Sequence, residues 1–82
     1  MIIVNLSDIN QIVEISKVCE KYRSDVAVDA YCGRYIVDAA SVLGMQSMIG
    51  NKVELKPLGS DRDKVAKLVD ELLQINGVKT EC

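Results

Sequence analysis

The chain has 82 residues, of which 49% are hydrophobic and 27% are charged, and its net charge is −2. This length predicts one domain over residues 1–82 with a modest core, because chains of this size bury only about 60–65% of their unfolded surface. The 10 basic residues are balanced by 12 acidic ones and the only aromatic residues are three tyrosines, so we do not expect nucleic-acid binding. No apolar run is long enough to span a membrane and no basic leader opens the chain, so we expect a cytoplasmic protein without membrane contact.

The start of the chain predicts a strand followed by an amphipathic helix. Residues 2–6 alternate in the way that is typical of a short strand, and Ser7 or Asp8 then offers an oxygen that can cap a helix. The apolar residues that follow recur at helical spacing, which predicts a helix of about fourteen residues. The main members of this apolar stripe are Ile12, Ile15, Cys19 and Tyr22.

A hairpin and a short helix are predicted next. Residues 26–31 alternate in character, Cys32 and Gly33 form a turn, and residues 34–38 return as a third strand. Ser41 is a favourable residue to cap the short helix after it, which ends near residues 49–51.

The second half predicts one more strand and one more helix. Residues 52–57 form the strand, which ends at Pro57 because proline lacks a backbone donor. Ser60 and Asp63 have the spacing of a helix cap, and apolar residues with a period near 3.6 follow them. Asn76 and Gly77 stop this helix, and residues 78–82 are expected to be a short C-terminal tail.

The predicted order of elements is therefore β-α-β-β-α-β-α. Alternating strands and helices with one apolar face predict an α+β open-faced sandwich, with a four-stranded antiparallel sheet covered on one face by three helices. A ferredoxin-like domain shares part of this order, but the short second helix and the added last helix disfavour it.

One segment indicates a family. Residues 37–48 read VDAASVLGMQSM, which fits the pattern Val-Asp-Ala-x-Ser followed by apolar, apolar, Gly, Met, x, Ser and an apolar residue. The segment resembles the regulatory-serine region of HPr, the histidine-containing phosphocarrier of bacterial sugar phosphotransferase systems. The resemblance covers nearly the whole chain and implies the HPr-like form of the open-faced sandwich.

The family's phosphoryl acceptor is missing, because the chain has no histidine. The histidine position falls near Asp8, Ile9 and Asn10, none of which can form a phosphoramidate as an imidazole does. Asp8 is interpreted as a helix cap rather than as an acceptor of phosphate. The resemblance therefore implies a relative that is not an enzyme, has no catalytic residue, cannot carry phosphohistidine and needs no cofactor.

The cysteines do not predict a metal site. Three cysteines without Cys-x-x-Cys spacing make a poor set of zinc ligands when histidine is absent. We interpret them as a buried helix residue, a turn residue and a terminal residue in a reducing compartment; they are Cys19, Cys32 and Cys82.

Ser41 is the candidate regulatory residue. In Gram-positive members of the family the matching serine is phosphorylated by a dedicated ATP-dependent kinase, and the resemblance implies the same role here. A phosphate at a helix start faces free amide groups and the positive end of the helix dipole. The alternative is that Ser41 only caps the helix, and Ala40 stands where the family usually has a lysine.

The short helix also carries candidate partner-binding residues. A helix of two turns cannot bury its whole surface, and methionine suits an adaptable docking surface. The candidates are Val42, Leu43, Met45, Gln46 and Met48. The alternative is that Leu43, Met45 and Met48 close the core over the sheet.

These observations favour an HPr-like regulatory or adaptor protein in the control of carbohydrate transport. Its expected partners are proteins, such as an HPr kinase-like enzyme or a transcription regulator. The alternative is a structural or oligomerising module that keeps only the fold, and the sequence leaves the oligomeric state open.

Overall fold

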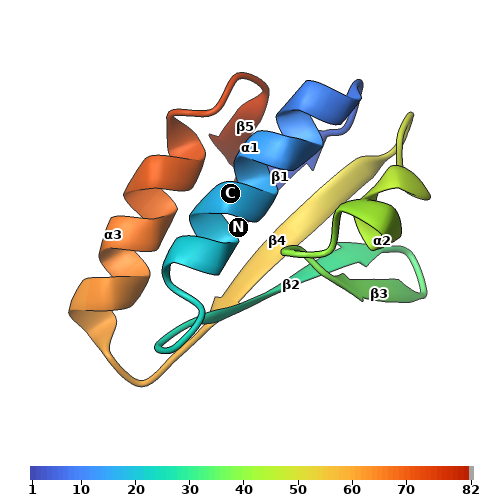
Figure 1. Cartoon of the computed structure of the whole chain (residues 1–82). Coiled ribbons are helices and arrows are strands. Elements are labelled where there is room, and N and C mark those ends of the chain that lie inside the picture. The colour runs from blue at the N-terminus through green and yellow to red at the C-terminus, as the bar shows by residue number, and fades with distance from the viewer. Residues whose placement is uncertain (82) are drawn as a thin grey trace.

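A five-stranded antiparallel sheet forms one layer of the structure, and three helices cover one of its faces (Figure 1). The computed structural model describes residues 1–81. The strands lie in the order β3-β2-β4-β1-β5, and their bounds are Ile2–Asn5 (β1), Ala27–Cys32 (β2), Tyr35–Asp38 (β3), Lys52–Leu58 (β4) and Val78–Thr80 (β5). The helices are Ile9–Lys21 (α1), Val42–Gln46 (α2) and Arg62–Leu73 (α3). The predicted α+β class, the three helices and the open antiparallel sheet are confirmed.

The prediction of a four-stranded sheet with a tail over residues 78–82 is wrong, because residues 78–80 form β5. Gly77 takes a φ of 92°, which reverses the chain after α3 and returns it along the outer edge of β1. Val78 then lies opposite Val4 and is buried, while Thr80 and Glu81 stay exposed. Cys82, the terminal residue of the predicted tail, lies outside the described residues.

The core lies between the helices and one face of the sheet. The register places Val4 opposite both Val53 and Val78, and it places Ala30 opposite Leu55, so these side chains share one face. The helices add a second set of fully buried side chains, which includes Ile12, Ile15, Leu68 and Leu72. Each large side chain in this layer stabilises the fold by about 1.5–3 kcal/mol relative to an exposed position.

Aspartates cap the two long helices. The Asp8 carboxylate accepts a hydrogen bond from the Gln11 amide at 2.9 Å, so Asp8 rather than Ser7 caps α1. In α3 the cap is Asp61, which accepts from the amides of Asp63 and Lys64, and the predicted cap at Ser60 is one residue early. Both residue types satisfy free amides at a helix start, which explains the small error.

Gln11 ties the start of α1 to the turn that leads into β5. This side chain is almost fully buried; its Oε1 accepts from the Ser7 amide and its Nε2 donates to the Asn76 carbonyl, both at 2.9 Å. A Cβ atom at Gly77 would lie only 2.4 Å from Gln11 Nε2. The turn therefore needs glycine both for its φ and for the room that Gln11 occupies.

The substitution Gln11→Ala tests this connection. It leaves the Ser7 amide and the Asn76 carbonyl without their partner, so we expect the free energy of unfolding to fall by about 1–2 kcal/mol. Urea unfolding measures the change, and Asn10→Ala at the exposed neighbouring position is the matched control. Equal stabilities of the two variants would contradict the role given to Gln11.

Candidate functional site around Ser41

Ser41 is held at the start of α2 by a tight turn after β3. The Asp38 carboxylate accepts from the Ala40 amide at 2.9 Å, and the Asp38 carbonyl accepts from the Ser41 amide at 2.9 Å. The Ser41 hydroxyl then accepts from the Gly44 amide at 3.2 Å and remains exposed. Ser41 is thus the N-cap of α2, as predicted, and its oxygen is accessible from outside.

A buried serine anchors this turn to the middle of α1. Ser16 Oγ donates to the Ala40 carbonyl at 2.6 Å, and the Ser16 side chain is almost fully buried. The residue before Ser41 is therefore fixed by α1 as well as by β3. Sequence reasoning missed Ser16, although its place beside Ile15 and four residues after Ile12 was a signal that it borders the apolar stripe.

Gly44 allows α2 to approach β3 closely. A Cβ atom at this position would lie 3.2 Å from Val37 Cβ and 3.3 Å from Ser41 Oγ, which is tighter than ordinary van der Waals contact. The glycine of the sequence pattern therefore has a packing reason in this structure. Any larger residue would push α2 away from the sheet or displace the Ser41 hydroxyl.

The five candidate docking residues divide into two groups. Met45 and Met48 are buried in the core, with exposed fractions of 0% and 2%, so the prediction that they form a docking surface is wrong for these side chains. Leu43 is 81% exposed, Gln46 is exposed and Val42 is half-buried. We call Ser41, Val42, Leu43 and Gln46 the α2 surface. Exposing a leucine to this extent costs solvation free energy, which makes Leu43 its most notable member.

The position expected for the family's histidine is polar and acidic. Asp8, Ile9 and Asn10 are all exposed, and the Asp8 carboxylate is engaged by the Gln11 amide. A shallow depression of about 180 Å³ lies here, and its two charged lining residues, Asp8 and Glu14, are both acidic. Their charges oppose the approach of a phosphoryl group.

In the part of the chain that the structure describes, no group of three or more cysteine, aspartate or glutamate side chains could hold a metal ion. Cys19 is buried, and removal from water raises the pKa of its thiol to about 12, which keeps it protonated and unreactive. Cys32, predicted in a turn, is the last residue of β2 and is half-buried. Within residues 1–81, no helix combines the length and the apolar character that crossing a bilayer requires.

Comparison of the chain with protein-family models, with curated proteins and with solved structures gives no significant match. These comparisons neither support nor oppose the resemblance to HPr, which stays a prediction from residues 37–48.

The substitution Ser16→Ala tests how α2 is held. Without the donor, the partly buried Ala40 carbonyl loses its partner, and we expect the chain to lose about 1 kcal/mol of stability. Amide hydrogen exchange of residues 41–46 should accelerate more than exchange in α3, because the lost contact is local. The exposed Ser24 offers a matched control as Ser24→Ala. Unchanged exchange in α2 would show that Ser16 does not hold this helix.

Proposed function

We propose that this chain is a regulatory or adaptor protein of the HPr-like type, which recognises partner proteins through the α2 surface. The observation that carries the proposal is the exposed pair Ser41 and Leu43 on a helix whose opposite side is anchored by Met45. An exposed apolar side chain beside a modifiable hydroxyl suits a contact whose strength is regulated. The cytoplasm is the proposed setting.

The HPr-like topology is part of this proposal. The elements from β1 to α3 follow the order β-α-β-β-α-β-α that the resemblance implies, and this agreement supports it. In this reading β5 is an addition at the free edge of β1, beyond the four strands of the family.

Phosphoryl transfer through the chain is not part of the proposed role. No imidazole exists, Asp8 serves as a helix cap, and the depression around it is acidic. We therefore propose a non-catalytic protein that binds partners rather than one that passes phosphate onward.

Phosphorylation of Ser41 is the proposed switch. A phosphate there adds a charge of about −1.5 to −2 next to the first amides of α2 and two residues from Leu43. The proposed partners are an HPr kinase-like enzyme, which would modify the serine, and a transcription regulator, which would read its state.

Incubation with ATP and an HPr kinase tests the switch directly. We expect a mass increase of one phosphate on the native chain and none on Ser41→Ala. Ser47→Ala is the matched control, because Ser47 is an exposed serine at the other end of the same helix. The switch is refuted when a genuine HPr gains phosphate in the same reaction and this chain does not.

The same kinase assay tests docking through Leu43. The substitution Leu43→Asp removes the apolar contact and adds a charge, so we expect KM for the protein substrate to rise about tenfold or more. Leu58→Asp places the same change on a leucine of β4 that is 56% exposed, and it should leave KM nearly unchanged. Equal effects of the two substitutions would argue against docking at α2.

An oligomerising module is the second candidate. The edge strand β3 exposes Tyr35 and Ile36, and it carries neither a lysine nor a proline that would discourage pairing with another strand. Light scattering separates the two functions, because a stable dimer that Ile36→Lys disrupts would favour this alternative.

A further inference from the structure

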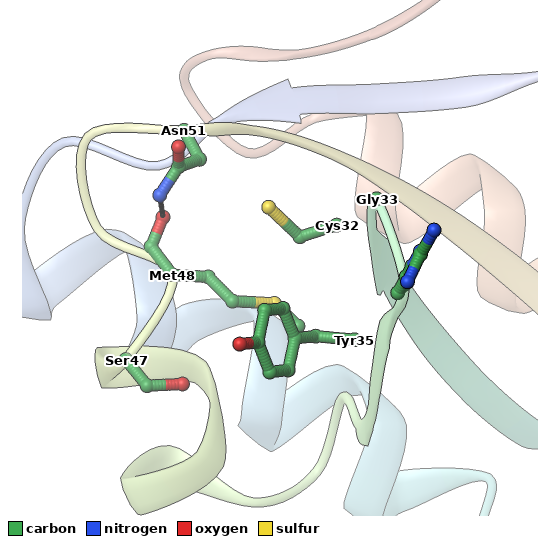
Figure 2. Close-up of a pocket in the computed structure, with 7 residues that line it drawn as sticks. Cys32, Gly33, Tyr35, Ser47, Met48 and Asn51 are labelled. Carbon is green, nitrogen blue, oxygen red and sulfur yellow. Dashed lines mark hydrogen bonds between the residues drawn. The ribbon is translucent and has the colours of Figure 1, made fainter.

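A cleft opens between the β2–β3 hairpin and the connection from α2 to β4 (Figure 2). Its volume is about 640 Å³, which lies within the range of about 300–1,000 Å³ that is usual for small-molecule sites. The lining residues come from these two segments and are Cys32, Gly33, Arg34, Tyr35, Ser47, Met48 and Asn51. None of them belongs to the α2 surface.

The interior of the cleft is apolar. Met48 is 2% exposed and closes the side toward the core, and Figure 2 shows the Cys32 sulfur directed into the open space. Tyr35 lies opposite Cys32 in the register of the hairpin and is 75% exposed. A thioether, a thiol and a phenol ring together offer a surface that suits an aromatic or branched aliphatic group.

The polar groups of the cleft carry one charge, and it is positive. Arg34 is the only charged lining residue, and within residues 1–81 its guanidinium forms no ion pair. Asn51 Nδ2 donates to the Met48 carbonyl at 3.3 Å, which fixes one wall, while Ser47 Oγ donates to the Gly44 carbonyl. A ligand with a negative group would therefore find a cation without a competing carboxylate in the lining.

We propose that this cleft binds a small amphipathic anion, an aromatic or branched aliphatic molecule that carries a carboxylate or sulfonate group. The apolar body lies against Met48, Cys32 and the Tyr35 ring, and the anionic group pairs with Arg34. A neutral molecule of the same shape gains only the apolar contact, and a cation is repelled. This proposal is independent of the role given to Ser41 and Leu43.

The test uses the full chain and two fluorescent probes that differ by one sulfonate. The anionic probe is 8-anilinonaphthalene-1-sulfonate, and the neutral probe is N-phenyl-1-naphthylamine. We expect saturable binding of one anionic probe per chain, with nuclear magnetic resonance shifts confined to residues 32–35 and 47–51. Arg34→Gln should weaken the anionic probe about threefold or more at low salt and leave the neutral probe unchanged, since an exposed ion pair is modest and screened. Tyr35→Ala should weaken both probes.

A matched control and a second measurement keep the result unambiguous. Arg62→Gln changes an exposed arginine on α3 and should leave both affinities unchanged. In a Cys82→Ser background, the bound anionic probe should also slow the alkylation of Cys32, while buried Cys19 stays unlabelled with or without the probe. Shifts that map elsewhere, affinities insensitive to Arg34→Gln, or an unprotected Cys32 would each overturn the proposal.

Discussion

The candidate surface and the cleft both depend on the packing of α2 against the sheet. A helix of five residues cannot persist alone in water, because its nucleation cost exceeds the few hydrogen bonds that it closes. Burial of Met45 and Met48 supplies the missing free energy, and Gly44 allows the close approach to Val37 that makes this burial possible. Because these contacts determine which way α2 faces, they also determine that Leu43 and the Ser41 hydroxyl lie outside.

The same packing explains why two different surfaces lie side by side. The side of α2 away from the core presents Leu43, whereas the chain that leaves α2 places Ser47 and Asn51 opposite the tip of the β2–β3 hairpin. Met48, which follows α2, connects the core to the cleft, because its side chain is part of the core and also closes the cleft from within. A change in the position of α2 would therefore alter the cleft as well.

Local patterns in the sequence were sufficient to predict most elements and the cap at Ser41. Alternation located the strands from β1 to β4, and the stripe through Ile12 and Ile15 located α1, because each pattern extends over several residues. The strand β5 has three residues with only Val78 buried, so no alternation existed to reveal it.

The long-range contacts could not be predicted in this way. Ser16 and Gln11 form hydrogen bonds to residues 24 and 65 positions away, and the cleft joins segments that meet only in the folded chain. Periodicity carries no information on such long-range contacts. It also could not decide which apolar residues of α2 face inward, since a helix this short has no complete stripe.

Phosphoryl transfer and the proposed recognition at α2 place different demands on the fold. Phosphoryl transfer needs a nucleophile at the start of α1, where this chain has an aspartate cap and a second acidic residue nearby. Recognition at α2 needs only the contacts from Met45, Gly44 and Ser16 that hold the helix, and none of these involves the start of α1. The proposed recognition at α2 therefore does not depend on a nucleophile at the start of α1, although Leu6, just before that helix, exchanges backbone hydrogen bonds with Gly50 and Asn51 after α2. Partner binding without phosphoryl transfer is therefore physically coherent for this chain, because the contacts that hold α2 do not include a nucleophile at the start of α1.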